Sequence, residues 1–163
     1  MMRSLSSQAR LSLAIVVTTL CALGAVGAHA QGTFTSTVSS TAVPLIGVVG
    51  GGTESVSFSG EAQIKANVVT DPEFGSTPSV VLTIDMGNVI GLGALTGAKY
   101  LNSDRGIFTR RLASADTVQY TFPFYLSGTS PVSSARIGRA SFNLSFDVTT
   151  MQLVGASGRI DSP

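Results

Sequence analysis

Cysteine, histidine and tryptophan are nearly missing from this chain of 163 residues, which has one cysteine, one histidine and no tryptophan. Cys21 and His29 both lie in the first 30 residues, which have the features of an export signal. Residues 31–163 therefore contain neither residue type. Their absence excludes catalysis by a cysteine nucleophile or a histidine base, zinc-finger and histidine–haem sites, and disulfide bonds.

Charged residues are also scarce, at 12% of the chain. Residues 31–163 hold eight basic and nine acidic side chains, which gives a net charge of −1. This near-neutral balance argues against a nucleic-acid partner, because such partners are held by neutralisation of phosphate charge. Serine and threonine are abundant instead, with 33 residues in the same range.

The first 30 residues have the three parts of a secretory signal peptide. Arg3 and Arg10 supply the positive start, and Leu11–Val26 is uncharged and largely apolar. Ala28 and Ala30 are the small residues that a signal peptidase requires. We therefore expect cleavage after Ala30 and a bacterial protein that is periplasmic or extracellular.

Other interpretations of this segment fit its residues less well. A retained membrane anchor is an alternative, because Leu11–Ala28 is 18 residues long, at the short end of a membrane span. The residues before Cys21, Thr18-Thr19-Leu20, do not match a lipoprotein signal. No adjacent pair of arginines precedes the apolar stretch, which favours the general secretory route over the twin-arginine route.

Alternation of apolar and polar residues predicts β-strands through most of residues 31–163. The clearest runs are Ser79–Met86, Thr117–Tyr125 and Ala140–Val148. Shorter or less regular runs predict further strands at Thr33–Ser39, Glu54–Ser59, Glu61–Val69, Gly106–Leu112 and Met151–Gly155. One-sided alternation is typical of antiparallel strands that bury one face.

Turn-forming residues separate these strands, and no stretch shows a sustained helical period. We predict one all-β domain over residues 31–163: an antiparallel β-sandwich, immunoglobulin-like or jelly-roll-like, with about eight strands and little helix. A small barrel remains open. An outer-membrane barrel is disfavoured, because most strands are shorter than ten residues and the chain does not end in an aromatic-terminated strand. Thr149-Thr150 predicts a tight hairpin, and Pro123 predicts an edge strand or a bulge.

No motif predicts a cofactor or a metal. The glycine-rich run Gly87–Gly97 lacks the third glycine of a dinucleotide fingerprint and the Lys-Ser/Thr of a phosphate loop, so its glycines are expected to bend a strand or allow a close approach. Four turn acids are expected to be solvated: Asp71, Glu73, Asp104 and Asp116. A hydrolase that uses two carboxylates is a remote alternative.

The basic residues form no catalytic motif either. Neither Lys65 nor Lys99 lies in a Ser-x-x-Lys motif of the kind used by serine hydrolases. Four arginines could form a local anion-binding patch or protect sheet edges: Arg110, Arg111, Arg136 and Arg139. The second interpretation is favoured.

Two candidate contact regions follow from the strand pattern. Three tyrosines, Tyr100, Tyr120 and Tyr125, could line a cleft for a small ligand or glycan. An N-terminal strand that contains Thr33, Phe34, Thr35 and Val38 could pair with a neighbouring subunit. The uncharged stretch Thr41–Gly50 that follows is expected to be a buried crossover or an irregular core strand.

These observations favour a non-enzymatic, exported β-domain that acts as a structural or binding module. Its partner would be a second copy or another surface protein, reached through an exposed strand edge. Exported β-rich chains of this composition have the general character of pilin and adhesin subunits. The disulfide pair and the C-terminal aromatic residue of such subunits are absent, so no family is assigned.

Overall fold

Nine strands and no helix make up the residues described by the computed structural model, which are 35–71, 77–102, 105–129 and 135–163. The strands are β1 (Thr35–Val49), β2 (Val56–Thr70), β3 (Ser79–Asp85), β4 (Ile90–Gly93), β5 (Lys99–Leu101), β6 (Arg105–Arg111), β7 (Ala115–Leu126), β8 (Arg136–Asp147) and β9 (Gln152–Asp161). The predicted signal peptide and Thr33, Phe34, Glu73 and Asp104 lie outside the described residues. In the described ranges, no helix is long and apolar enough to cross a membrane.

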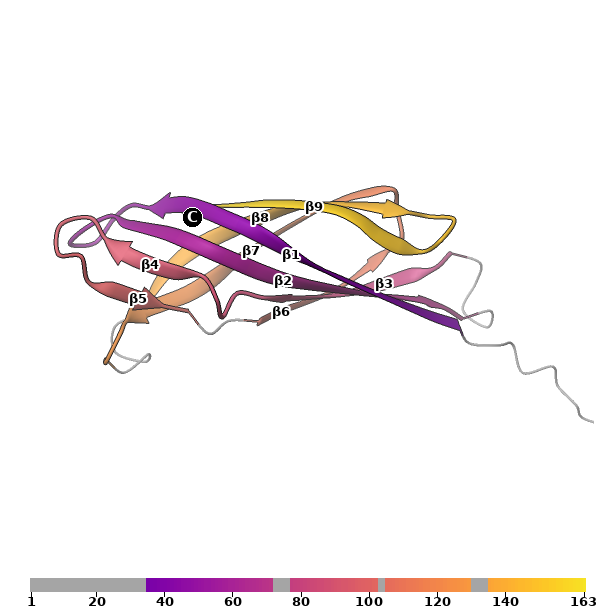
Figure 1. The fold of residues 1–163 in the computed structure, drawn as a ribbon, viewed down its shortest axis with the longest axis horizontal. Coiled ribbons are helices and arrows are strands. Elements are labelled where there is room, and N and C mark those ends of the chain that lie inside the picture. Colours follow the sequence, from indigo (N-terminus) through magenta and orange to yellow (C-terminus); the bar gives the residue numbers. More distant parts are fainter. Residues whose placement is uncertain (1–34, 72–76, 103–104, 130–134) are drawn as a thin grey trace, which may run out of the picture. The chain divides into compact units, whose positions relative to one another are not determined.

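All nine strands belong to one sheet, in the order β1-β9-β8-β7-β5-β4-β2-β3-β6. Because β1 also pairs with β2, seven of the strands form a closed ring, and β3 and β6 extend the sheet from the far half of β2. Figure 1 shows β1 and β2 crossing in front of β7 and β8. The all-β prediction is confirmed, and the pairing unites nine strands in one sheet where a two-sheet sandwich of about eight was expected.

The N-terminal part of the sheet is more regular than the sequence indicates. Thr41–Gly50, expected as a crossover or irregular strand, continues the preceding residues as the single strand β1, which pairs with β2 along its whole length. The separate strands expected at Glu54–Ser59 and Glu61–Val69 are likewise one strand, β2. Gly60 has a φ of +148° and lies between the segment of β2 that pairs with β4 and the segment that pairs with β3.

The glycine-rich run forms a short strand and a turn. Ile90–Gly93 is β4, and the three-residue strand β5, which was not predicted, follows the turn. At the other end of the chain, β9 continues six residues beyond the predicted Gly155, to Asp161. The hairpin predicted at Thr149-Thr150 is present, with Asp147 Oδ1 accepting from both backbone N–H groups at 2.8 and 3.2 Å.

The core lies between the inward faces of the strands and is almost entirely apolar. Three phenylalanine rings meet at its centre: Phe58 is 4.9 Å from Phe124 and 5.7 Å from Phe122, both edge to face. Each such pair contributes about 0.5–1.5 kcal/mol beyond the apolar area that it buries. Inward glycines give the rings space, since a Cβ on Gly91 or Gly138 would approach Phe58 or Phe122 to within 3 Å.

The ring closes where β1 meets β9. In the described residues these parallel strands share one ladder pair, Gly47 with Ile160. A Cβ on Gly47 would lie 1.9 Å from the carbonyl oxygen of Ile160, so only glycine permits this approach. Farther along, the Leu153 N–H donates to Ser39 Oγ at 3.0 Å, so a side chain continues the contact.

We therefore expect Gly47→Ala to destabilise the protein by about 2 kcal/mol or more, the cost of overpacking against a backbone that cannot move away. Urea denaturation followed by circular dichroism measures the change in unfolding free energy. Gly155→Ala on β9 is the matched control, because its Cβ would meet nothing closer than 3.7 Å. Equal stability of the two variants would contradict this account of the closure.

Candidate functional site

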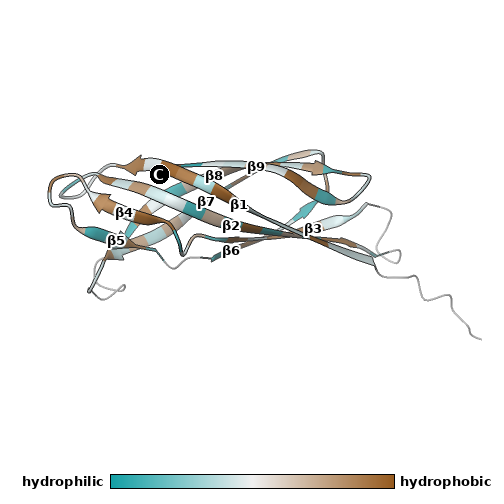
Figure 2. Ribbon diagram, viewed as in Figure 1, coloured by the Kyte–Doolittle hydropathy of each residue, from teal (hydrophilic) through white to brown (hydrophobic). Residues whose placement is uncertain are grey.

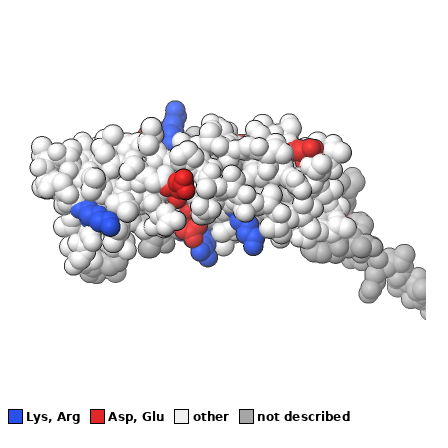
Figure 3. Space-filling model, viewed as in Figure 1, with Lys and Arg blue, Asp and Glu red and all other residues white. Residues whose placement is uncertain are grey.

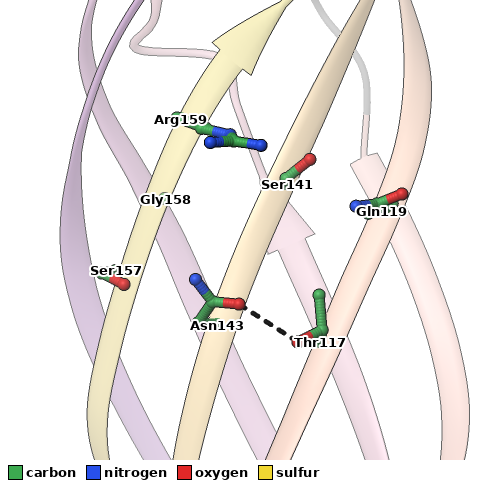
Figure 4. Close-up of a pocket in the computed structure, with 7 residues that line it drawn as sticks. All are labelled: Thr117, Gln119, Ser141, Asn143, Ser157, Gly158 and Arg159. Atoms are coloured by element: carbon green, nitrogen blue, oxygen red, sulfur yellow. Dashed lines mark hydrogen bonds between the residues drawn. The ribbon is translucent and has the colours of Figure 1, made fainter.

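A shallow groove of about 280 Å³ lies on the outer face of β7, β8 and β9. Seven residues line it: Thr117, Gln119, Ser141, Asn143, Ser157, Gly158 and Arg159. Figure 4 shows that each of the three strands contributes to the lining. The volume is near the lower limit of small-molecule sites, which suits a ligand of a few atoms to one sugar ring in size.

Strand register explains why the polar residues gather here. Alternate residues of a strand share a face, and the pairing aligns them in two rows across the three strands. One row is Thr117, Asn143 and Ser157, and the next is Gln119, Ser141 and Arg159. The opposite faces of the same strands carry core residues such as Val118, Phe142 and Ile160.

The first row is ordered by a side-chain hydrogen bond. Thr117 Oγ1 donates to Asn143 Oδ1 at 3.1 Å, which fixes the orientation of the amide. Figure 4 shows the Asn143 amide nitrogen on the side of the amide that faces β9. A donor is therefore held at the middle of the groove.

The second row contains an unsatisfied hydroxyl. Ser141 is only 8% exposed although it lies on the outer face, because Gln119 and Arg159 flank it in the register. Its Oγ has no hydrogen-bond partner among the described residues. A polar atom buried without a partner costs about 1–3 kcal/mol, so a ligand that displaced the exposed Arg159 side chain beside it and supplied the bond would recover free energy.

The groove carries a partly neutralised positive charge. Arg159 Nε lies 3.5 Å from Asp161 Oδ2, and Arg139 Nε lies 3.1 Å from Asp161 Oδ1. Two guanidinium groups thus share one carboxylate, which leaves a net charge of +1. The Arg159 side chain is 72% exposed and can reach a ligand in the groove.

The groove is lined by neutral polar side chains and one guanidinium group. They offer hydroxyl, amide and guanidinium groups, and no carboxylate that could act as an acid or base is among them. Within the part of the chain that the structure describes, no three His, Cys, Asp or Glu residues gather to hold a metal ion.

The tyrosines predicted to line a cleft are not part of this groove. Tyr100 is buried 5.8 Å from the Phe124 ring, and Tyr120 faces inward between Phe108 and Phe142. Tyr125 is five residues beyond Tyr120 on β7 and therefore lies on the opposite face of the strand. The structure thus divides the three tyrosines between the core and the outer surface.

The described part of the strand predicted to pair with a neighbouring subunit is paired along one of its edges with β2 of the same chain. Thr35 pairs with Thr70 and Val38 with Asn67, as part of the full ladder between β1 and β2. Val38 is 55% exposed and points outward. Deleting this segment would remove pairs from the sheet itself, so loss of assembly in such a deletion would not identify an assembly strand.

The other charged residues considered as candidates from the sequence lie on different strands and do not form one cluster. Asp116 is 3.8 Å from Arg110, and Arg111 is exposed on the outermost strand, β6. The guanidinium of Arg136 lies 5.1 Å from the centre of the Phe124 ring and donates to the carbonyl oxygen of Gly51. Arg110 and Arg111 lie on β6 and Arg136 and Arg139 on β8, so the four arginines do not form one anion-binding patch.

Glu54 is a buried carboxylate that the sequence did not distinguish. It follows the β1–β2 turn and accepts hydrogen bonds from the backbone N–H groups of Leu95 and Thr96, at 3.0 Å each. The Thr96 and Tyr100 hydroxyls donate to it at 2.7 and 3.1 Å. These bonds, foremost the one from the Thr96 hydroxyl, lower the pKa of Glu54 to about 2. With four donors, this carboxylate joins two turns and is not a free acid.

Sequence reasoning found part of the groove. The outward positions of β7 and β8 were predicted as polar from their alternation. Ser157 and Arg159 were missed because Gly155 and Gly158 interrupt the pattern of β9, which was expected to end at Gly155. The side-by-side arrangement of the three strands depends on pairing that the sequence does not state.

Comparison with protein-family models, with curated proteins and with solved structures found no match to this chain.

The bonds at Glu54 predict a pH dependence of stability. The carboxyl binds its proton more weakly in the folded protein than in the unfolded chain, so stability falls as pH is lowered from about 4.5 towards 2. Glu54→Gln should be less stable at neutral pH and should decline less steeply with acid. Asp85 and Asp147, whose pKa values are also lowered, by Arg105 and by the Thr150 N–H respectively, retain part of the decline.

Thermal unfolding between pH 2 and pH 7 measures this effect. Lys65→Gln, which removes a charge at an exposed position of β2, is the control and should leave both the stability and its acid dependence as in the wild type. A Glu54→Gln protein with the wild-type profile would show that the carboxylate does not join the turns.

Proposed function

We propose that the protein is a non-enzymatic binding module that holds a small hydroxyl-rich ligand with one carboxylate, such as an acidic sugar, in the groove of β7, β8 and β9. Export to the periplasm or cell exterior, inferred from residues 1–30, is part of the same proposal. The observation that carries it is the unpartnered Ser141 hydroxyl within two aligned rows of hydrogen-bonding side chains.

The chemistry of the groove favours this ligand class. Thr117, Asn143 and Ser157 suit the alternating donors and acceptors of sugar hydroxyls. Arg159 supplies a charge-assisted bond to a carboxylate, and the net charge of +1 near it matches one negative charge. An apolar ligand would find little contact, because aromatic and aliphatic side chains are absent from the groove lining.

A titration with sodium glucuronate, monitored by ¹H–¹⁵N NMR, tests the proposal. Shifts should concentrate at residues 117–119, 141–143 and 157–159, and glucose should bind more weakly because it lacks the carboxylate. Arg159→Gln should weaken glucuronate binding by about tenfold, since hydrogen bonds to charged groups contribute about 1.5–3 kcal/mol. Arg111→Gln, on β6, is the control. Equal effects of the two variants, or shifts that avoid the groove, would refute the proposal.

Ser141→Ala separates a binding role from a structural one. Since the hydroxyl makes no bond to the described residues, its removal should leave stability unchanged or raise it. Glucuronate affinity should nevertheless fall. A loss of stability with unchanged affinity would assign the hydroxyl to the fold instead.

A further inference from the structure

A second outer surface differs sharply from the groove because it is apolar. It lies on β1, β2, β4 and β5, and we define the apolar face as Ile46, Val48, Ile90, Leu92 and Leu101. Ile46 is 73% exposed, Val48 54% and Leu92 53%. Leu95, in the turn after β4, is 81% exposed.

The ladders place these residues in two adjacent rows. The first row contains Ile46, Ser59, Ile90, Leu101 and Tyr125, one residue from each of five neighbouring strands. The second contains Val48, Ser57, Leu92 and Lys99. The apolar face is therefore continuous across the sheet and interrupted only by two small serines on β2.

These side chains are not needed to complete the core. Their neighbours along the strands, including Leu45, Val49, Val56 and Phe58, point inward and are already buried. Figure 2 shows the hydrophobic colouring of β4 and of the C-terminal part of β1. In Figure 3 the surface over the same elements is mostly white, with few charged groups. A contiguous apolar surface of this kind marks an interaction site.

The charges at the border of the apolar face indicate its partner. Lys99 ends the second row on β5, and Glu61 lies two residues beyond Ser59 on β2; both are exposed. One charge of each sign at separate corners makes the surface complementary to itself. An anionic membrane or a nucleic acid would instead call for several cations.

We propose that two copies of this chain associate through the apolar face, with Lys99 of each copy against Glu61 of the other. Five strands at a spacing of about 4.8 Å give a contact about 19 Å across. This extent corresponds to a weak, reversible dimer rather than an obligate one. A twofold pairing uses the same surface of both copies and forms each ion pair twice. The groove is lined by other residues, Thr117 and Gln119 of β7 and residues of β8 and β9, and stays open, so dimerisation is independent of ligand binding.

Sedimentation equilibrium of protein expressed from the full-length sequence, over a hundredfold range of concentration, tests the proposal. The wild type should pass from monomer to dimer and no further. Ile46→Asp should weaken the dimer by at least about tenfold, because it buries a charge in the contact at the most exposed residue of the apolar face. Ile107→Asp, at a 66% exposed apolar position on β6, is the matched control and should dimerise as the wild type does. Circular dichroism checks that both variants fold.

Charge reversal identifies the pairing. Lys99→Glu and Glu61→Lys should each weaken the dimer by about fivefold, because each places two like charges together. The double variant should restore the affinity, because its Glu at position 99 again faces a Lys at position 61 of the other copy. A double variant weaker than either single one would overturn the pairing. A wild type that stays monomeric throughout, or that is monomeric but sediments with phosphatidylcholine vesicles, would overturn the dimer, the latter in favour of a lipid surface.

Discussion

The meeting of β1 with β9 at Gly47 is the constraint on which the rest of the structure depends. This pair turns a sheet that would otherwise have an edge at β1 into a closed ring. Closure brings the inward faces of β2 and β7 together in the phenylalanine cluster of Phe58, Phe122 and Phe124. A chain that has no disulfide in this region relies on such burial for its stability.

The few charged side chains are largely used to join loops and strands. Glu54 connects the turn after β1 to the turn after β4, and Arg136 connects β8 to the Gly51 carbonyl at the same end of the ring. The Ser162 hydroxyl also accepts there, from the Gly50 N–H at 2.9 Å. The polar groups named here are therefore occupied by hydrogen bonds within the protein. The unpartnered Ser141 hydroxyl lies elsewhere, in the groove on the outer face of β7, β8 and β9.

The alternation of apolar and polar residues predicted the most regular strands. It did not predict the features that depend on which strands pair with one another. β3, β7 and β8 follow their alternation closely. The continuity of β1 across Pro44 and of β2 across Gly60 was missed, because each residue ordinarily interrupts a strand, whereas here the ladder continues on both sides. Ser141 was predicted as an outward polar residue, but its burial arises from Gln119 and Arg159 on neighbouring strands. Such cross-strand effects have no local signal in the sequence.

The closure of the ring also has a consequence for the order of folding. The contact from Gly50 to Ser162 joins residues 112 positions apart, and β9 is the last strand of the chain. Loop-closure entropy opposes contacts of such long range until the intervening strands have formed. The ring therefore cannot be completed before β9 is available. If the chain is exported as we propose, a segment that has crossed the membrane without β9 cannot yet close the ring.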